Sequence, residues 1–394
     1  MTKALIIGGG IAGPITAMAL QRAGISATVH EAYDRTADGV GAFLSLATNG
    51  LDVLHTLDLL DAVRHTGFAT PRMEILMDGR RLAEIEHGGA LADGTVAHTV
   101  RRAGLYAALR EEALRRGIAI EYGKRLAAAE TGPDRTVLAR FDDGTEATGD
   151  LLIGADGLHS VTRTLIDPAA PRPRYLGMLN TGGYARGVRV DGEVGVMRMA
   201  FGRRCFFCWI PMPDGDVWWF ANPPADRDPG RTVTSPRVWR DELTALFAGD
   251  DFPAAELIAA SDEIASPWAT YDLPKVPTWH RDRMIIVGDA AHAVSPSSGQ
   301  GASMAMEDAI TLAKCLRDVP DVPAAFAAYE ALRRPRVERV VAQGRRNGSG
   351  KTVGRIGRLL LPLVFRLFAG KPGAQSWMYD HRVDWATPVT PVAA

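Results

Sequence analysis

In the stretch VGDAAHAVSPSSGQGASMAMEDA, residues 287–309, five side chains of the types that perform acid–base and nucleophilic chemistry lie within residues 289–298. They are Asp289, His292, Ser295, Ser297 and Ser298. An aspartate, a histidine and a serine are the parts of a hydrolase triad, but a nucleophilic serine is expected on an elbow of the form G-x-S-x-G. No serine of the stretch has those flanks. We therefore interpret Ser297 and Ser298 as residues that cap a loop.

The elements expected around this stretch indicate a different chemistry. Residues 284–287 are an apolar run that predicts a short strand, and Gly288 and Asp289 follow it. A loop with Pro296, Gly299 and Gly301 comes next, and a helix is expected to start near Ala302. The first amides of a helix lack partners within the helix and carry the positive end of its dipole. The stretch therefore predicts a binding loop for an anion or an electron-rich group.

A second glycine-rich segment lies near the N-terminus, in KALIIGGGIAGPITAMALQRAG. Gly8, Gly10 and Gly13 form the pattern G-x-G-x-x-G between a predicted strand and a predicted helix, whose first residues are Ile11 and Ala12. In this context the glycines permit a tight turn, close approach of the backbone to a pyrophosphate, and close packing of helix on strand. The segment predicts a βαβ dinucleotide-binding unit with phosphates at the helix N-terminus.

Glu31 ends the second strand predicted for this unit, where an acidic side chain can accept hydrogen bonds from an adenosine ribose. A carboxylate would repel a 2′-phosphate, so NADP is not expected at this site. The fingerprint alone suits either NAD or FAD. The sequence has no second dinucleotide fingerprint, because GGYARG has Tyr184 in place of the second glycine. It has no P-loop either, because RRNGSGKT has Arg345 where a P-loop needs glycine.

Composition and charge limit the kinds of partner. The 394 residues carry a net charge of -1 with both signs interspersed, which does not favour nucleic acid or an anionic membrane surface. An apolar run at residues 359–368 is interrupted by Pro362 and Arg366 and is too short to span a bilayer, so we expect a capping helix there without stable membrane insertion. We predict a cytoplasmic protein, a monomer or homodimer, with small-molecule partners.

The three cysteines, Cys205, Cys208 and Cys315, fit a reducing compartment. Cys205 and Cys208 lie three apart in a predicted strand and should face opposite ways, so we expect neither a disulfide nor a metal site there. We expect no metal ion elsewhere in the chain.

The order of the predicted elements indicates an α/β protein with two domains. A Rossmann-like dinucleotide-binding domain with C-terminal helices is expected to be discontinuous, over residues 1–70, 98–170 and 280–394. Residues 71–97 and 171–279 are predicted to form an inserted, mostly antiparallel β-sheet domain that binds the substrate. Asp-Gly pairs at residues 78–79, 143–144 and 214–215 predict hairpin turns.

Three motifs in a fixed order reveal a family resemblance: GGGIAG at Gly8, GADGLHSVTR at Gly154 and GDAAHAVSPSSGQGASMAMEDA at Gly288. The segments HTVRRAGL, with Arg102, and AAYEALRRPRVERV support it. Together they resemble the class A flavin-dependent monooxygenases of the p-hydroxybenzoate hydroxylase or salicylate hydroxylase type. The resemblance spans nearly the whole chain and implies an FAD-binding domain of the glutathione reductase type.

The resemblance also implies roles for individual residues. Glu31 and the three glycines would hold the ADP half of FAD, Asp289 the ribityl chain, and Arg102 would lie near the flavin or its phosphates. The loop after Asp289 would line the isoalloxazine ring. Asp156 would serve FAD positioning and NAD(P)H use, although a turn aspartate at a strand end can also be structural. The full set of predicted FAD-binding residues is Gly8, Gly10, Ile11, Ala12, Gly13, Glu31, Arg102, Asp156, Gly288, Asp289, Pro296, Gly299, Gln300, Gly301 and Ala302.

The reaction follows from the same resemblance. NADH or NADPH binds transiently and reduces FAD, which reacts with O2 to a C4a-hydroperoxide that transfers one oxygen atom to an aromatic or other electron-rich small molecule. The protein supplies orientation, electrostatics and exclusion of water. The sequence assigns no catalytic residue.

The substrate is expected between the flavin ring and the inserted sheet. Aromatic residues of the sheet are candidates for its apolar wall, although such residues commonly form a core instead. The candidates are Phe206, Phe207, Trp209, Trp218 and Trp219. Tyr184, Arg186 or Arg198 could help to deprotonate a phenolic substrate.

Other functions of the same fold stay open at this point. A flavin-dependent halogenase usually has W-x-W-x-I-P, whereas residues 206–211 are FFCWIP, with neither tryptophan in place. A reductase acting on isoprenoid chains and a non-catalytic flavin-binding protein are further alternatives.

Overall fold

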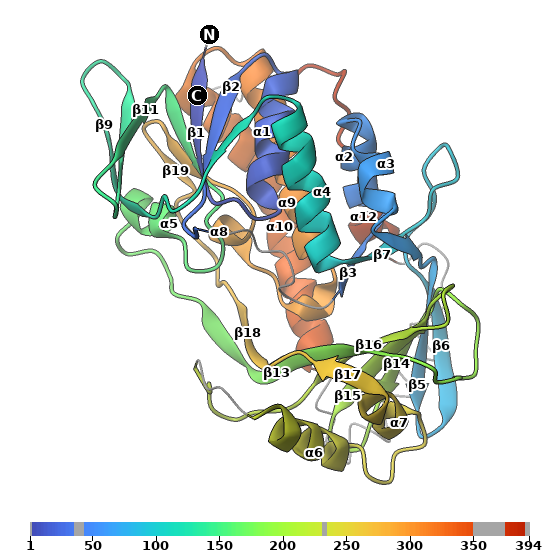
Figure 1. Cartoon of the computed structure of the whole chain (residues 1–394). Coiled ribbons are helices and arrows are strands. Elements are labelled where there is room, and N and C mark those ends of the chain that lie inside the picture. Colours follow the sequence, from blue (N-terminus) through green and yellow to red (C-terminus); the bar gives the residue numbers. More distant parts are fainter. Residues whose placement is uncertain (1, 35–42, 231–234, 350–374, 391–394) are drawn as a thin grey trace.

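The computed structural model describes residues 2–34, 43–230, 235–349 and 375–390 of the chain (Figure 1). Two layers are built around separate sheets, and the chain passes between them several times. The capping helix expected at residues 359–368 lies outside the described residues. Among the helices that are described, none has the length and hydropathy to cross a membrane.

The first layer contains a six-stranded sheet in the order β19-β20-β12-β1-β2-β8. Its strands are β1 (Lys3–Ile7), β2 (Ser26–His30), β8 (Ala119–Glu121), β12 (Leu151–Gly154), β19 (His280–Arg281) and β20 (Met284–Ile286). All pairings are parallel except that of β19 with β20. Strands β1, β12 and β20 are almost entirely buried and apolar, as expected for a parallel sheet covered on both faces.

Helices cover this sheet, and α1 and α9 pack closely on each other. The helices of the layer are α1 (Ala12–Arg22), α2 (Thr48–Thr56), α3 (Leu60–Arg64), α4 (Arg102–Arg115), α5 (Val161–Ile166), α8 (Asp289–His292), α9 (Gly301–Asp318), α10 (Val322–Ser349) and α12 (Ser376–Tyr379). A small antiparallel sheet, β9 (Leu126–Thr131), β10 (Val137–Phe141) and β11 (Glu146–Gly149), lies beside α5. Most of the buried apolar residues belong to one core around these elements.

The second layer is a larger, mostly antiparallel sheet in the order β17-β13-β16-β15-β14-β5-β6, with β18 also paired to β13. Its strands are β5 (Arg72–Met77), β6 (Arg80–Glu86), β13 (Arg174–Ala185), β14 (Val196–Phe201), β15 (Phe206–Pro211), β16 (Val217–Asn222), β17 (Ser261–Ile264) and β18 (Trp268–Asp272). Only β14 and β5 pair in parallel. The hairpin turns predicted at the three Asp-Gly pairs are confirmed by the pairings of β5 with β6, β10 with β11 and β15 with β16.

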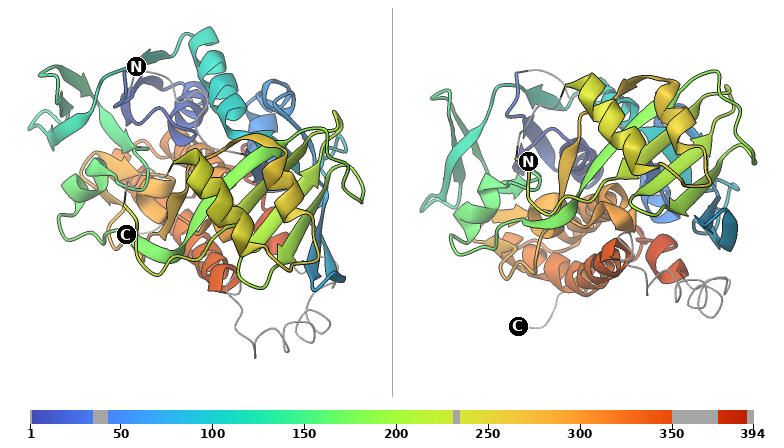
Figure 2. Two further views of the ribbon diagram at one scale, coloured as in Figure 1. Left: turned by 60° about the horizontal axis from the view of Figure 1, so that its bottom comes forward. Right: turned by 90° about the horizontal axis from the view of Figure 1, so that it is seen from below.

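The two faces of this sheet bury different side chains. Helices α6 (Pro236–Leu246) and α7 (Ala254–Ala259) cover the outer face, as Figure 2 shows, and Cys205 belongs to the core beneath them. Cys208 belongs to a separate cluster on the inner face, which is turned toward the first layer. The prediction that these cysteines face opposite ways is confirmed, and none of the three cysteines is joined in a disulfide.

A three-stranded sheet of β3 (Phe43–Leu46), β7 (His98–Arg101) and β4 (Gly67–Ala69) lies between the layers (Figure 1). Strand β7 pairs with both neighbours and leads directly into α4. Because Arg101 ends the strand and Arg102 begins the helix, two adjacent arginines lie at the junction of the layers.

His87, just after β6, is buried and its ring contacts that of Tyr379 in α12 edge to face, with centroids 5.1 Å apart. Burial lowers the pKa of His87 from 6.5 to about 4. Between these pH values the unfolded chain binds a proton that the folded chain does not, so stability falls as the pH falls, by up to about 3 kcal/mol.

We therefore expect His87→Gln to reduce the loss of stability between pH 7 and pH 4.5. Urea unfolding of the protein at several pH values measures this, with the wild type as reference because other histidines also contribute. An unchanged pH dependence would show that His87 is not buried in its neutral form.

Candidate functional site

Four neighbouring parallel strands of the first sheet end at one edge, and a predicted binding residue follows each. Gly8 follows β1, Glu31 follows β2, Asp156 lies two residues after β12, and Gly288 and Asp289 follow β20 closely. Since carboxyl ends of parallel strands meet at the same edge, segments about 280 positions apart are brought together there. Ligands of open α/β sheets bind at this edge.

The glycine loop after β1 has the close contacts that its sequence pattern predicts. Gly8 has φ +109°, and a Cβ there would lie 2.4 Å from the carbonyl oxygen of Ala155. A Cβ on Gly13 would lie 1.9 Å from the carbonyl oxygen of Gly8, so only glycine lets the helix pack this closely. At Gly10 the nearest atom to such a Cβ is 3.7 Å away, in the ring of Tyr106. Gly8 and Gly13 shape the loop, whereas Gly10 leaves its outer side open.

The carboxylate of Glu31 stabilises the glycine loop. It accepts hydrogen bonds from the backbone N–H of Gly9 at 2.6 Å and of Tyr33 at 2.9 Å. A carboxylate has about four acceptor positions, so further hydrogen bonds from a ribose remain possible.

Asp156 is turned toward helix α5. One carboxylate oxygen accepts from the Ser160 hydroxyl at 2.5 Å, and the other accepts from the backbone N–H and hydroxyl of Thr162 at 2.9 and 3.0 Å. Ser160 itself caps α5 by accepting from the N–H of Arg163. These hydrogen bonds match the alternative in which Asp156 is a structural turn aspartate at a strand end. Asp156 therefore holds the loop after β12 in place.

Arg163, within the second motif but not predicted as a site residue, ties two loops together. Its buried guanidinium donates to the carbonyl oxygens of Leu158 at 2.9 Å and of Ala290 at 3.0 Å. The loops after β12 and β20 are thereby joined by one side chain.

Asp289 is the acidic residue of the third motif that is left open, whereas Glu307 and Asp308 are paired. Its side chain is exposed, and no hydrogen bond joins its carboxylate to another described residue. The protein around it raises the pKa of Asp289 by desolvation, an effect that His292 and Arg102 oppose. Gly288 before it has φ +59°, and a Cβ there would lie 3.4 Å from that of Ala12. The first and third motifs are therefore in contact.

Arg102 and Tyr106 complete this part of the site. The Arg102 guanidinium donates to the Tyr106 hydroxyl at 3.2 Å and 2.9 Å, and Tyr106 lies against Gly10. Helix α4 thus presents a cation beside both Asp289 and the glycine loop. Tyr106 follows Arg102 by one helical turn, a spacing that could have identified it in the sequence.

The predicted binding loop forms a short 3-10 helix, η1 (Pro296–Ser298), followed by Gly299 in the left-handed region and then by helix α9. The predicted start of this helix near Ala302 is confirmed to within one residue. Ser298 accepts a hydrogen bond from the N–H of Gln300, as predicted for a capping residue. The Ser297 hydroxyl has no hydrogen-bond partner among the described residues, so Ser297 is not a cap, and Ser295 accepts from the N–H of Ser297 instead. Gln300 is buried and accepts from the Asn49 side chain at 2.8 Å, so it fixes the loop from behind.

Helix α10 supports the back of this loop. A Cβ on Gly344 would lie 3.0 Å from that of Ser298, and a Cβ on Gly348 would lie 3.3 Å from the Ser295 hydroxyl. Gly348, in the segment that partly matches a P-loop, and Gly344 just before that segment therefore permit close packing of the helix on the loop.

A buried network of charges lies behind the same loop. Asp308 accepts from His292 at 2.5 Å, from Arg333 at 2.7 Å and from the backbone N–H of Gly288 at 2.8 Å. Burial acts to raise the pKa of Asp308, but His292 and Arg333 outweigh it and hold the pKa at about 2. The partner of His292 is thus Asp308, and Asp289 stays free for a ligand.

Glu307 extends the network to the C-terminal segment. It accepts from Arg333, from Arg336 at 2.7 Å and from Asn49 at 2.6 Å. Arg336 also donates to the carbonyl oxygens of Trp377 and Met378. None of these residues was predicted from the sequence, because the role of each one becomes visible only in its contacts with residues far away in the chain.

The predicted substrate residues fall into three places. Phe207, Trp209 and Trp219 lie in the core beneath α6 and α7, where Phe207 stacks on Trp219 with centroids 5.4 Å apart. Arg186 is exposed and pairs with Asp216 and Asp262. The three aromatic side chains are thus buried in that core, and Arg186 is engaged by acidic side chains. We therefore correct the prediction that these four residues line a substrate cavity.

Tyr184 and Trp218, by contrast, lie on the inner face with their rings edge to face, 5.3 Å between centroids. Phe206 belongs to the same inner face, whereas Arg198 is buried and pairs with Glu74 at 3.0 Å. The inner face of the sheet is therefore rich in aromatic side chains.

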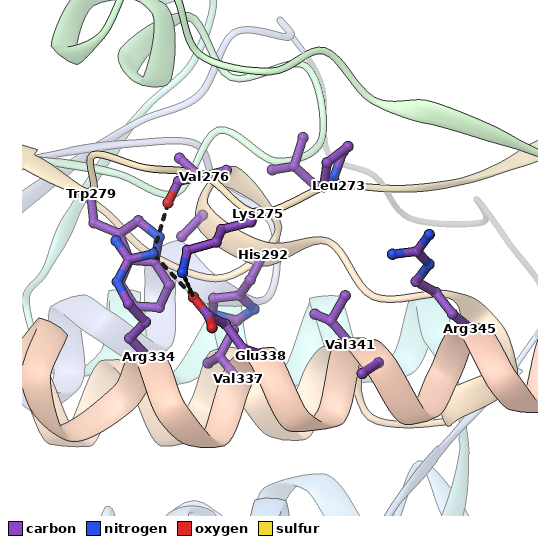
Figure 3. Close-up of a pocket in the computed structure, with 13 residues that line it drawn as sticks. Leu273, Lys275, Val276, Trp279, His292, Arg334, Val337, Glu338, Val341 and Arg345 are labelled. Atoms are coloured by element: carbon purple, nitrogen blue, oxygen red, sulfur yellow. Dashed lines mark hydrogen bonds and ion pairs between the residues drawn. The ribbon is translucent and has the colours of Figure 1, made fainter.

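A separate pocket of about 150 Å³ lies between α10 and residues 273–279 (Figure 3). Trp279, Val337 and Val341 line it, and His292 reaches it from the third motif. Its charged side chains are paired, as in the Lys275–Glu338 contact of 3.1 Å. None of Asp289, Gly301 and the fingerprint glycines lines this pocket. Within the described chain no group of histidine, cysteine and acidic residues could hold a metal ion.

Comparison with known proteins identifies the ligand of the site. Residues 1–344 match the family model of the FAD binding domain. A 3-amino-4-hydroxybenzoate 2-monooxygenase of Streptomyces platensis is 35% identical over 87% of each chain. The chain belongs to the class A flavin-dependent monooxygenases.

Two further relatives of this flavin-dependent monooxygenase are informative. An FAD-dependent urate hydroxylase of Klebsiella pneumoniae is 31% identical over 87% of this chain and 89% of its own length. The crystal structure of Klebsiella pneumoniae HpxO with FAD and uric acid superposes with a TM-score of 0.82, at 28% identity and 95% coverage of both chains. The protein is an FAD-dependent oxidoreductase of the monooxygenase type, and the α/β fold with an antiparallel second sheet is confirmed.

The monooxygenase's own residues fit FAD. The glycine loop lacks side chains where a pyrophosphate would approach, and Asp289 has an open carboxylate. The α9 N-terminus lies beside Asp289, since a Cβ built on Gly301 would lie 4.0 Å from its Oδ1. Hydroxyl groups of a ribityl chain are donors that such a carboxylate can accept.

Proposed function

We propose that the protein hydroxylates a small aromatic substrate held between the loop at residues 296–302 and the inner face of the second sheet. Two features of the fold carry the proposal. The carboxylate of Asp289 is open at the strand ends of the first layer, and the aromatic side chains of Tyr184 and Trp218 lie on the face of the second sheet that is turned toward that layer.

Several residues would hold FAD in this proposal. The amides after Gly10 and the N-terminus of α1 would bind the pyrophosphate, Glu31 the ribose and Asp289 the ribityl chain. The amides of Gly299 to Ala302 would face the ring system and favour negative charge on it. Arg102 would lie beside Asp289 and the phosphates.

Bound FAD would supply electron transfer from NADH or NADPH and activation of O2. The protein's part is to orient the aromatic ring, to exclude water with the inner face of the sheet, and to hold the loop rigid through Gln300 and Asn49. No described side chain is required to act as a nucleophile.

The purified protein is expected to be yellow and to consume NAD(P)H faster when an accepted aromatic compound is present. A panel of hydroxybenzoates, aminohydroxybenzoates and urate, followed by mass spectrometry of the products formed under 18O2, tests this. We expect one labelled oxygen atom per product molecule. NAD(P)H oxidation that yields only hydrogen peroxide with every compound would contradict a hydroxylase of aromatic rings, and colourless protein that cannot take up FAD would contradict the flavin site.

A further inference from the structure

The pocket between α10 and residues 273–279 has no part in the proposed function (Figure 3). It is lined neither by the residues assigned to FAD nor by the aromatic side chains on the inner face of the second sheet. Its volume of about 150 Å³ is close to that of an engineered apolar cavity that holds one benzene molecule. The pocket therefore has room for one small ring and is too small for a dinucleotide.

One stripe of helix α10 forms a wall of the pocket. Arg334, Val337, Val341 and Arg345 follow one another at intervals of three or four residues, so they share one face of the helix, as Figure 3 shows. The stripe is apolar in its middle and has a guanidinium group at each end. Because one helical turn rises about 5.4 Å, a ring that lies against Val341 is within reach of Arg345.

Two rings of the pocket wall are fixed by other parts of the fold. The buried ring of Trp279 lies under the guanidinium group of Arg334, whose central carbon is 4.6 Å from the ring centroid. His292 is held by Asp308, with its Nε2 2.5 Å from a carboxylate oxygen. Because these rings are already held in place, a ligand loses little binding free energy to reorganisation of the pocket.

The charges at the first end of the stripe compensate one another. Glu338 pairs with Lys275 at 3.1 Å and with Arg334 at 3.5 Å. Arg334 also pairs with Glu330 at 2.6 Å. Two cations therefore meet two carboxylates, and this end of the pocket offers no excess charge to a ligand.

At the other end, one carboxylate serves two guanidinium groups. Arg345 is half-exposed, and its acidic partner among the described residues is Asp272, at 3.6 Å. The two oxygens of Asp272 already accept hydrogen bonds from Arg174 at 3.1 and 2.6 Å. One positive charge is therefore left over beside the apolar middle of the pocket. A carboxylate attached to a small apolar group complements both features.

We propose that this pocket is a second ligand site, which binds a small carboxylic acid of about the size of benzoate. The ring lies against the apolar middle of the α10 stripe, beside Trp279, and the carboxylate accepts hydrogen bonds from Arg345. The site adjoins the FAD site through α8, which begins with Asp289 and ends with the pocket residue His292. The inference goes beyond the proposed function and does not depend on it.

Calorimetric titration of the FAD-loaded protein with benzoate and with neutral benzamide tests this proposal without turnover. The wild type is expected to bind benzoate with a Kd below about 1 mM, and benzamide at least about tenfold more weakly. Arg345→Gln should weaken benzoate roughly tenfold and leave benzamide unchanged, because it removes a charge-assisted hydrogen bond. Val341→Trp should abolish the binding of both compounds, because the larger side chain fills the pocket.

Arg339→Gln is the matched control. Arg339 is an exposed arginine of the same helix that lies over the ring of Trp377, outside the pocket, so its replacement should leave benzoate binding unchanged. Arg345→Lys should keep part of the affinity, since an ammonium group retains the charge but lacks the planar fork. A crystal soaked in 4-bromobenzoate should show the anomalous peak of bromine beside Val341.

Benzoate that binds only between the two layers would be insensitive to the Arg345 and Val341 variants. That result, a bromine peak confined to the region between the layers, or equal losses in Arg345→Gln and Arg339→Gln would overturn the proposal, as would a wild type that prefers benzamide. Since no step of the experiment involves NAD(P)H or O2, its outcome is independent of whether the protein hydroxylates an aromatic ring.

Discussion

Replacing Asp289 with alanine is expected to yield protein that purifies largely without FAD. The open carboxylate of Asp289 has no partner among the described residues, so the fold does not depend on it. A hydrogen bond to a charged group contributes about 1.5–3 kcal/mol, which corresponds to a loss of roughly 10- to 100-fold in FAD affinity. Fluorescence titration of the apoprotein with FAD measures this directly.

Two variants sharpen this experiment. Ser297→Ala alters a neighbouring loop residue to which we assign no ligand, and it should retain FAD like the wild type. Asp289→Asn keeps an acceptor oxygen and should lose less affinity than Asp289→Ala. Similar losses in the Ser297 and Asp289 variants would mean that the loop as a whole, and not the Asp289 carboxylate, determines FAD binding.

The sequence predicted the glycine loop and the strand ends of the first sheet because their signals are local. Gly8 and Gly13 are required by contacts within a few residues or with the adjacent strand, and such requirements appear directly as glycine spacing. Asp289 was identified for the same reason, through its place after a short apolar strand. A resemblance based on three such motifs could therefore indicate FAD before any tertiary contact was known.

The second sheet shows what local patterns cannot provide. Alternation in residues 206–211 predicts two faces for β15, but it does not say which face α6 and α7 will cover, since those helices come later in the chain. Phe207 and Trp209 were consequently predicted on the substrate side and lie on the other. Asp156 illustrates the same limit at one residue, because its side chain could turn toward a ligand or toward α5.

Arg333→Leu is expected to have the largest effect on stability. Arg333 is only 2% exposed and donates to both Asp308 and Glu307, so its removal leaves two buried carboxylates with fewer compensating charges. Breaking a buried ion pair from one side typically costs about 3–5 kcal/mol. Thermal and urea unfolding of the FAD-loaded protein should reveal this loss. Arg345→Leu, on the same helix, removes a half-exposed arginine paired with Asp272 at 3.6 Å and should cost less than about 1 kcal/mol.

The pH profile distinguishes loss of the charge network from loss of packing. The pKa of Asp308 is lowered from 3.8 to about 2, so its contribution is complete above pH 3.8 and is lost as the pH falls through 2. Without Arg333 the pKa of Asp308 should rise toward 3.8, so the part of the acid-induced loss of stability that comes from Asp308 should become smaller and should end at a higher pH. Because Asp308 also holds the Gly288 amide next to Asp289, the variant should release FAD more readily. A variant that is destabilised but keeps the acid profile and the FAD affinity of the wild type would show that Arg333 acts through packing alone.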